Sequence, residues 1–330
     1  MAFSDIKGQD SIVKYLRNSL IKERIPPALL FVGKSGTGRF LTAKTFAKAL
    51  NCPNVKYDCC DKCKSCIAIQ HNVHPNVNII GRNSDVIKIE DIRSVINSSY
   101  LPVNEGYRVN IIDNADKATV EAFNSMLKYL EEPPKHTVNI LIAEIAELLP
   151  ETIRSRAVEL KFKPLNLSFI KEAVKRKGLS DEDAEVIARI ANGSMENIDS
   201  LCSEDFLKKR KSFITSLLGF LLNEVTISAL LNHWNDFAIS NNPKEKTRSF
   251  FDTFSTVIKD ILLVSILHDT EHITNIDFLG YIANRFAFIN GSNFQRIYKL
   301  LKEKESALLT NANPYYILLD ALFQVKEVIR

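Results

Sequence analysis

The hydrophobic and polar positions divide the chain into two parts of different character. In residues 1–163, short apolar runs alternate with longer segments whose apolar residues recur at three- and four-residue spacing. Several of the short runs are almost continuously apolar, which is typical of parallel strands covered on both faces. The runs predict β-strands at Ala28–Val32, Val77–Ile80, Val86–Ile89, Arg108–Asp113, Val138–Ala143 and Val158–Phe162.

The segments between these runs predict helices at about 40–50, 91–99 and 117–130. We expect the third helix to end at Glu131-Glu132-Pro133-Pro134, because proline has no amide hydrogen and cannot continue the helical ladder. Strands that alternate with helices in this way predict a doubly wound α/β domain.

After Pro164 the pattern becomes helical throughout. Residues 164–203 show short helical segments. Longer amphipathic patterns follow at Phe206–Leu222, Lys246–Leu267 and Phe294–Leu308. The sequence therefore predicts three parts: an α/β domain at 1–163, a small helical domain at 164–203 and a C-terminal helical domain at 204–330.

Composition narrows the class of protein without identifying it. A hydrophobic fraction of 45% and a charged fraction of 25% are typical of a soluble globular protein. Apolar stretches such as Ile261–Leu267 are too short to cross a bilayer, and the residues after Met1 do not form a signal peptide. We therefore expect a cytoplasmic protein. A net charge of +4 does not by itself indicate nucleic-acid binding.

A glycine-rich loop follows the first predicted strand and opens a helix. In this position glycines let successive backbone N–H groups face an anion, so the candidate phosphate-binding residues are Gly33, Gly36, Gly38 and Arg39. The working pattern places lysine and then a hydroxyl residue after the last glycine, whereas this chain has Arg39 and Phe40. Phenylalanine cannot bind Mg²⁺, and a guanidinium does not replace lysine cleanly. A turn without ligand and weak, vestigial nucleotide binding both remain open, but neither predicts efficient hydrolysis of Mg-ATP.

A second departure lies after the strand that begins at Arg108. Hydrolytic P-loop enzymes usually carry aspartate and then glutamate here, the first assisting Mg²⁺ and the second polarising water. Asp113 keeps the first carboxylate, but Asn114 cannot act as a base. Taken alone, the segment would be an ordinary strand-to-helix turn with Asp116 as its N-cap.

Five of the six cysteines fall between residues 52 and 66. Cys52, Cys60, Cys63 and Cys66 have the spacing of a four-thiolate zinc site, and a reducing compartment favours metal binding over disulfides. Cys59 could in principle replace Cys60, although the regular spacing favours Cys60.

Four thiolates leave no open coordination position, so the metal is expected to be structural. The competing interpretation is a zinc ribbon that binds nucleic acid. Lys56, Lys62 and Lys64 supply charge for it, but Tyr57 is the only aromatic residue among them, and a base-stacking platform needs more. We therefore expect an insertion that stabilises the fold. Cys202 is most simply a buried apolar residue.

Several stretches together resemble a known family. They are Phe3–Gln9, Gly33–Arg39, the cysteine cluster, Asn124–Pro134 and Leu149–Arg156. The chain resembles the delta-prime family of bacterial DNA polymerase III clamp-loader subunits through nearly all of residues 1–200, and only diffusely beyond. The resemblance implies an AAA+ P-loop-type parallel sheet domain with a zinc-binding insertion, a helical lid domain and a C-terminal helical collar domain.

The same resemblance implies a role for Arg156. In that family an arginine after a serine reaches the γ-phosphate of ATP in a neighbouring subunit. This chain keeps Ser155 and Arg156 but has Ala157 where the family has cysteine. Without the family context, Arg156 would be interpreted as a surface ion-pair residue, and Arg154 is the obvious decoy beside it.

The resemblance also places two further ATPase elements, and both depart from the hydrolysing pattern. Ala143 and Glu144 stand near the polar sensor-1 position. Glu196 follows Gly193-Ser194-Met195, where a hydrolysing subunit carries the sensor-2 arginine.

The expected function is therefore that of a non-hydrolysing, delta-prime-like subunit that supplies Arg156 in trans and carries structural Zn²⁺. The implied partners are the gamma or tau and delta subunits, primer–template DNA inside the assembly, weakly the sliding clamp, and no membrane. Two alternatives remain. One is an active AAA+ motor of the gamma/tau type that uses Arg39, and the other is a stand-alone zinc-containing DNA-binding protein.

Overall fold

The computed structural model describes residues 2–82, 84, 86–103, 105–236, 243–289, 291–308 and 313–329. The chain forms two compact units. Unit 1 consists of residues 1–166 together with 193–196, and unit 2 consists of residues 167–192 and 197–330.

Unit 1 is built on a five-stranded parallel sheet in the order β2-β3-β4-β1-β5. Central β1 pairs on both sides, so that Leu30 lies opposite Leu141 of β4 and Glu159 of β5. Five of the six predicted strands are thereby confirmed, with ends that shift by one residue at most. The strands are β1 (Ala28–Val32), β2 (Val77–Ile80), β3 (Arg108–Ile112), β4 (Thr137–Ala143) and β5 (Val158–Lys161).

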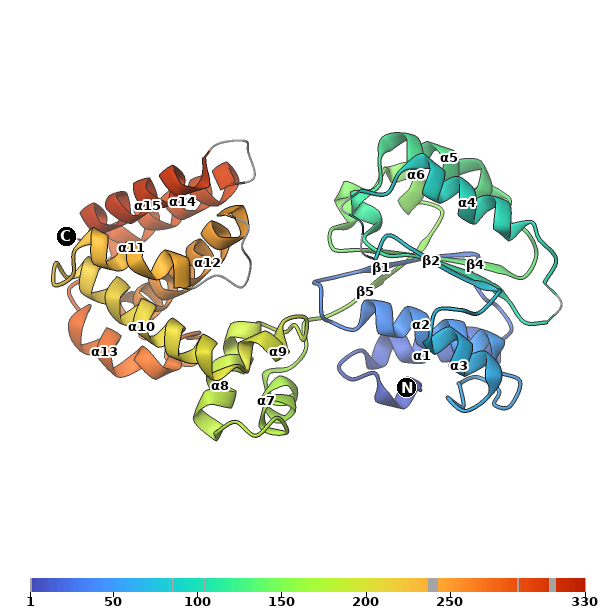
Figure 1. The fold of residues 1–330 in the computed structure, drawn as a ribbon, viewed down its shortest axis with the longest axis horizontal. Coiled ribbons are helices and arrows are strands. Elements are labelled where there is room, and N and C mark those ends of the chain that lie inside the picture. The colour runs from blue at the N-terminus through green and yellow to red at the C-terminus, as the bar shows by residue number, and fades with distance from the viewer. Residues whose placement is uncertain are drawn as a thin grey trace. The chain divides into compact units, whose positions relative to one another are not determined.

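Helices cover both faces of this sheet (Figure 1). On one face lie α1 (Asp10–Ile21), α2 (Arg39–Asn51) and α3 (Lys64–Gln70), and on the other α4 (Ile89–Ser99), α5 (Val120–Glu131) and α6 (Glu151–Arg154). Unit 1 has two hydrophobic cores. Because side chains alternate along a strand, Leu29 and Phe31 of β1 pack into one core, whereas Ala28 and Leu30 pack into the other. The predicted doubly wound α/β domain is confirmed.

The prediction of a strand at Val86–Ile89 is wrong. Only Ile87 makes a parallel bridge, to Ala118, and α4 already begins at Ile89. The Lys88 N–H donates to Asp91 Oδ2 at 2.9 Å, which caps the first turn of that helix. Ile87 is buried in the same core as Ile92 of α4, so the apolar residues fill a core without forming a strand.

Another predicted boundary shifts for a similar reason. The helix expected from about residue 117 starts at Val120, because Ala115–Lys117 forms a short 3₁₀ turn first. Thr119 then caps α5 by accepting a hydrogen bond from the Ala122 N–H at 3.2 Å.

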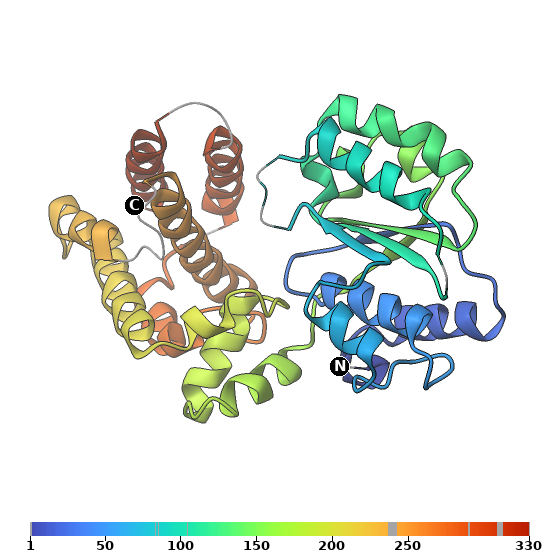
Figure 2. The same ribbon diagram turned by 45° about the vertical axis from the view of Figure 1, so that its right-hand side comes forward.

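Unit 2 is helical. The helices are α7 (Leu167–Lys175), α8 (Asp181–Ala191), α9 (Ile198–Leu201), α10 (Glu204–Leu221), α11 (Ile227–Asp236), α12 (Pro243–Leu262), α13 (Leu279–Arg285), α14 (Gly291–Leu308) and α15 (Pro314–Ile329). In Figure 2, α12 (brown) lies between α10 (yellow) and the α14–α15 pair (dark red). The helix predicted at Lys246–Leu267 is α12 followed by a π-helical turn, Leu263–Leu267.

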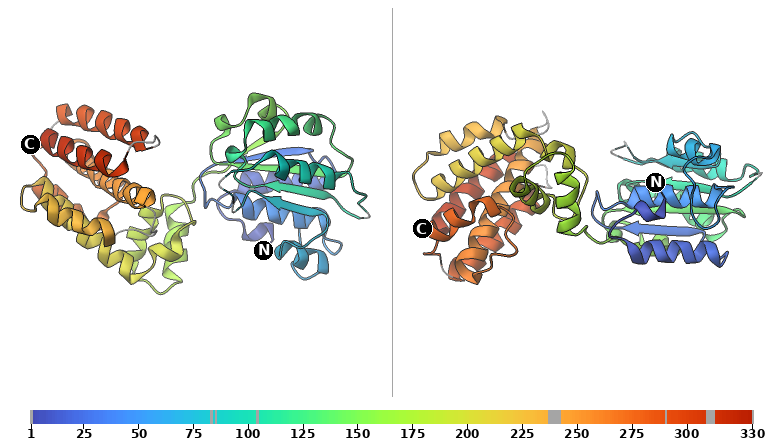
Figure 3. Two further views of the ribbon diagram at one scale, coloured as in Figure 1. Left: turned by 45° about the horizontal axis from the view of Figure 1, so that its top comes forward. Right: turned by 90° about the horizontal axis from the view of Figure 1, so that it is seen from below.

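The predicted split of the helical part into 164–203 and 204–330 stays a prediction, since both segments belong largely to unit 2. All five strands belong to unit 1, as the two views of Figure 3 show. Across the described ranges, no helix combines the length and the apolar character that a membrane span needs.

Candidate metal centre, phosphate loop and exposed arginine

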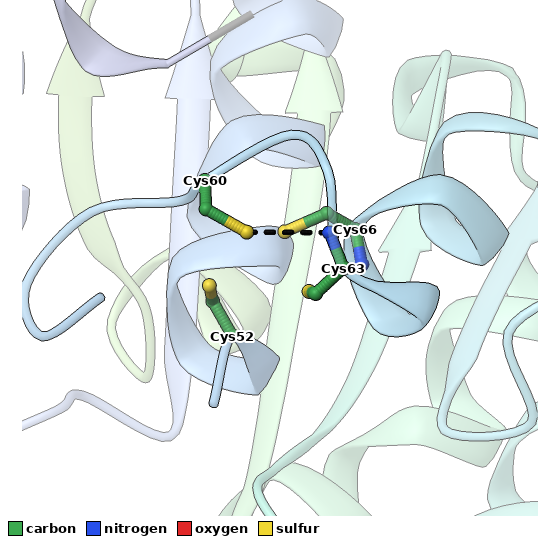
Figure 4. A group of neighbouring side chains, drawn as sticks. All are labelled: Cys52, Cys60, Cys63 and Cys66. Atoms are coloured by element: carbon green, nitrogen blue, oxygen red, sulfur yellow. Dashed lines mark hydrogen bonds between the residues drawn. The ribbon is translucent and has the colours of Figure 1, made fainter. Parts of the chain in front are cut away.

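The four cysteines with zinc-site spacing lie together in unit 1. The Sγ atoms of Cys52, Cys60, Cys63 and Cys66 all lie within 4.8 Å of one another. Figure 4 shows the four side chains turned toward a common point, with Cys52 at the end of α2 and Cys63 capping α3. Zinc bonds to sulfur are about 2.3 Å long and tetrahedral, so four thiolates at this separation fit a single zinc ion.

Backbone amides support the thiolate form of this cluster. The Cys63 N–H donates to Cys60 Sγ at 3.3 Å, and the Cys66 N–H donates to Cys63 Sγ at 3.4 Å. Hydrogen bonds from the amides of Lys62 and Cys63 lower the pKa of Cys60 to about 6. Burial instead raises the pKa of Cys66. A bound cation would favour deprotonation of all four thiols.

Cys59 lies outside the group. Its Sγ faces Asp61 Oδ1 at 3.8 Å, and burial raises its pKa to about 12. A thiol held in its neutral form beside a carboxylate is a poor zinc ligand. The geometry therefore favours Cys60 over Cys59, the order that the spacing also favours.

Three glycines of the loop between β1 and α2 have positive φ. Gly33, Gly36 and Gly38 have φ of +149°, +74° and +92°. A Cβ at Gly36 would lie 2.1 Å from Ser194 Oγ, so the loop is pressed against residues 193–196. The Met195 N–H donates to Gly36 O at 3.0 Å, which fixes this contact.

Acidic side chains approach the loop where phosphates would lie. Ser35 Oγ donates to Glu196 Oε1 at 2.7 Å, and the Ser35 N–H donates to Glu144 Oε1 at 3.4 Å. Arg39 at the start of α2 is buried, and burial lowers its pKa despite opposing carboxylates that include Glu144 and Asp113. The arginine charge is thus already balanced by the chain's own acids.

An arginine and an aromatic ring line the side of the pocket where a metal ion would be expected. The Arg82 guanidinium lies 3.7 Å from the centre of the Phe40 ring, and Arg82 Nη1 lies 3.8 Å from Asp113 Oδ2. Asn114 adopts a left-handed conformation and donates through Nδ2 to Gly81 O at 3.2 Å. These residues line a cavity of about 600 Å³. Phe40 offers no hydroxyl group to Mg²⁺, and the Asp113 carboxylate lies beside the Arg82 guanidinium.

Arg156 is exposed at the end of α6. Its guanidinium forms an ion pair with Glu131 of α5 through Nη2, and Nη1 donates to Thr152 O at 2.7 Å. Arg154 differs, because its Nε is buried without a hydrogen-bond partner. Of the two arginines, Arg156 is exposed and Arg154 is half-buried.

Sequence reasoning missed Arg82 and Ser35. Both act through contacts with residues far away in the chain, and neither matches a motif position. A lone arginine after β2 carries no local signal, so its place over Phe40 emerges only from the fold.

Comparisons with known proteins place the chain in a family. Residues 8–166 match the family described as "DNA polymerase III, delta subunit". The chain is 36% identical over 211 residues to DNA polymerase III subunit tau of Bacillus subtilis, covering 61% of this chain and 37% of tau. It is 32% identical over 207 residues to subunit delta′ of the same organism, covering 62% of this chain and 63% of delta′.

A solved structure of a DNA polymerase III gamma subunit-related protein from Thermotoga maritima aligns with a TM-score of 0.48 at 17% identity, over 96% of this chain and 99% of that chain. The matched part of this chain spans less than two thirds of either Bacillus relative. Through residues 8–166, the chain belongs to the family of DNA polymerase III clamp-loader subunits that includes delta′, gamma and tau.

Proposed function

We propose that this chain is a non-hydrolysing, delta-prime-type subunit of the DNA polymerase III clamp loader. In this role it packs beside a gamma or tau ATPase, donates Arg156 to that neighbour's ATP site and helps to load the sliding clamp on primed DNA. Its further partners are the delta subunit and, within the assembly, the backbone of primer–template DNA. Its C-terminal helices serve as a collar that joins the subunits.

The side chains that line the phosphate pocket carry this proposal. Phe40 lies beneath Arg82, Asp113 is paired with Arg82, and Glu196 bonds to the loop through Ser35. Each contact occupies a place that Mg²⁺ or a phosphate would need, and Asn114 offers no general base. A chain that cannot hydrolyse ATP contributes to such a complex through binding and through groups that it presents to others.

Arg156 is suited to act in trans. Its ion pair with Glu131 is exposed, and exposed pairs stabilise a protein by only about 0–1 kcal/mol. Release of the guanidinium toward a more highly charged phosphate therefore costs little. The buried Nε of Arg154 makes that arginine the poorer candidate.

The test is reconstitution of the loader with Arg156→Ala. An arginine supplied in trans accelerates P-loop hydrolysis by about 10³–10⁵-fold at the site that it serves. We expect the DNA-stimulated ATPase activity to fall by the whole contribution of the ATP site that Arg156 serves, and the clamp-loading rate to fall with it. Assembly of the complex, followed on a sizing column, should be unchanged. Arg154→Ala serves as the matched variant and should retain activity.

Normal ATPase in an assembled Arg156→Ala complex would remove the arginine assignment. The other part of the proposal is that the isolated chain does not hydrolyse ATP. A separate ATPase measurement on the purified chain tests that part.

A second candidate is a gamma/tau-type motor that uses Arg39 in place of lysine. The identities of 36% to tau and 32% to delta′ are too similar to separate the two candidates. It predicts tight Mg-ATP binding and measurable hydrolysis by the purified chain alone, whereas our proposal predicts neither.

We further infer that the four-cysteine centre holds structural Zn²⁺ through Cys52, Cys60, Cys63 and Cys66. Bound zinc would supply cross-linking of the α2 end to α3 and no catalysis, because four protein thiolates complete its coordination.

A further inference from the structure

A second cavity of unit 1 lies at the sheet edge opposite the phosphate loop. Arg108, which lines it, is the first residue of β3, whereas the phosphate loop follows the last residue of β1, and the strands are parallel. The cavity measures about 770 Å³ and is bounded by residues 50–53, Ser65, residues 74–76, residues 101–102, residues 105–106 and Arg108. The proposed clamp-loader role makes no use of it.

Arg108 gives this cavity a buried positive charge. The residue is 4% exposed. Its Nη1 donates to Pro75 O and its Nη2 to Leu101 O, both at 3.3 Å, while its buried Nε has no partner. Within the described ranges, Arg108 has no carboxylate partner. A buried guanidinium bound only by carbonyls is costly, so an anionic ligand would supply the missing counter-charge.

Ser65 adds a second donor, whose direction follows from the histidine beside it. The Asn76 N–H donates to His74 Nδ1 at 3.1 Å, so that nitrogen carries no proton. The ring proton of neutral His74 is therefore on Nε2, which lies 3.0 Å from Ser65 Oγ and donates to it. The Ser65 hydroxyl hydrogen is left to donate elsewhere, and among the described residues it finds no acceptor.

We propose that this cavity binds the phosphate monoester group of a nucleotide or of a DNA strand end. Arg108 and Ser65 line the same cavity, and both offer hydrogen-bond donors. A negatively charged acceptor would suit both of them. The volume lies within the range of about 300–1,000 Å³ for small-molecule sites, so it holds more than the phosphate alone. Its remaining walls combine apolar residues such as Leu50, Pro53 and Pro102 with polar residues such as Asn51 and Asn76, a mixture that suits a sugar and base.

Other charged groups at the cavity affect its net charge. Glu105 lines it and is exposed. Cys52 also lines it as a member of the metal centre, where a divalent ion would offset two of the four thiolate charges. Lys62 and Lys64, both exposed in the cysteine-bearing segment, add two positive charges to that segment, and positive charge attracts a phosphate.

The test compares short oligothymidylates that differ only in a 5′-phosphate or a 5′-hydroxyl group. Binding of each, labelled with fluorescein at the 3′ end, is measured by anisotropy with the full zinc-loaded chain. We expect the 5′-phosphate to tighten binding about tenfold. Ser65→Ala and Arg108→Met should each abolish most of that preference, and Glu105→Gln should increase it. Arg93→Met, on the exposed side of α4, is the matched control and should leave the preference unchanged.

Two results would overturn the proposal: equal affinity of the native chain for both oligonucleotides, or an unchanged preference in Ser65→Ala. Ser65→Ala keeps the test decisive if Arg108→Met fails to fold, and zinc content with thermal melting verifies each variant. Competition with thymidine 5′-monophosphate shows whether the bound phosphate group belongs to a free nucleotide or to a strand end. Displacement of the phosphorylated strand assigns a free nucleotide, and retention of that strand assigns the strand end. These outcomes are independent of ATPase measurements on the loader, so they do not depend on the proposed clamp-loader function.

Discussion

The choice between two adjacent cysteines shows what a single residue position decides. The spacing of the cysteines predicts a four-thiolate site but admits either Cys59 or Cys60 as one ligand. The fold separates them: the Cys60 thiol lies with the other three, and the Cys59 thiol faces Asp61. Asp61 adopts a left-handed backbone with φ of 55°, a local turn that sequence spacing cannot predict.

Replacing one ligand should therefore have a different effect from replacing its neighbour. We expect Cys60→Ser to lose zinc and to lower the midpoint of thermal unfolding, because a structural zinc site contributes directly to folding. Cys59→Ser is the matched variant and should keep about one zinc per chain. Metal content by mass spectrometry and melting with and without a chelator check both. Zinc retained in Cys60→Ser but lost in Cys59→Ser would reverse the assignment.

The acids beside the phosphate loop make a second prediction at this scale. Glu144 and Glu196 accept hydrogen bonds from Ser35, where an anion would bind. Replacing both with glutamine removes two negative charges while keeping shape. We expect the affinity for metal-free pyrophosphate to rise about tenfold, since removal of a like charge next to a bound anion is worth about 1.4 kcal/mol.

Calorimetric titration of the double variant measures this gain. Glu147→Gln with Glu151→Gln, both exposed and outside the cavity, is the control pair. An affinity equal to that of the native chain would mean that Phe40 and Arg82, and not the acids, close the loop. A gain of binding cannot result from misfolding, which makes this variant more informative than a loss.

At the scale of elements, three strands share a polar residue that sets their register. Asn78, Asn110 and Asn139 lie directly opposite one another on β2, β3 and β4. Asn78 Nδ2 donates to Asn110 Oδ1 at 2.8 Å, and Asn110 Nδ2 donates to Asn139 Oδ1 at 2.9 Å. Tyr129 of α5 joins them through its hydroxyl. A slip by one residue would leave these buried amides unpaired, so the ladder specifies the register.

Asn110→Leu should destabilise unit 1, although leucine is more hydrophobic than asparagine and suits a buried position. It removes one hydrogen bond each from Asn78 and Asn139, which keep Ser98 and Tyr129 as partners, and each lost hydrogen bond costs about 0.5–1.5 kcal/mol. Urea unfolding followed by circular dichroism measures the change, with Asn97→Ala on the exposed side of α4 as control. A loss below about 1 kcal/mol would show that the neighbouring amides find water instead.

The sequence predicts these strands better than it predicts what joins them. Val-Asn-Ile occurs in all three strands, and their apolar runs are unambiguous. The run around Ile87 has the same composition yet forms no strand, because the capping contact of Lys88 with Asp91 starts a helix there. Local composition does not distinguish an apolar residue that fills a core from one that extends a sheet. Arg82 over Phe40 was unpredictable for a related reason, since it depends on the packing of distant loops.

On the scale of the whole molecule, unit 2 is held together by a buried polar network of its own. Arg210 of α10 is 1% exposed and forms an ion pair with Asp277 at 2.8 Å. It also donates to Asn275 Oδ1 at 2.7 Å, and Asn275 donates in turn to buried Asp260 of α12 at 2.7 Å. These partners are up to 67 residues apart in the chain. Periodicity predicts the helices, but it cannot predict such pairings.

Because each unit has its own core, each should unfold by itself, and two changes should separate the transitions. Arg210→Met leaves Asp277 without its cation, and breaking a buried pair costs about 3–5 kcal/mol, so unit 2 should unfold earlier. Chelation of zinc should lower only the transition of unit 1. Trp234, the one tryptophan of the chain, belongs to unit 2, so its fluorescence follows that unit while a chromogenic chelator follows zinc release from unit 1. If either change moved both signals together, the two units would unfold as one cooperative body, and the division of the chain into independent units would be wrong.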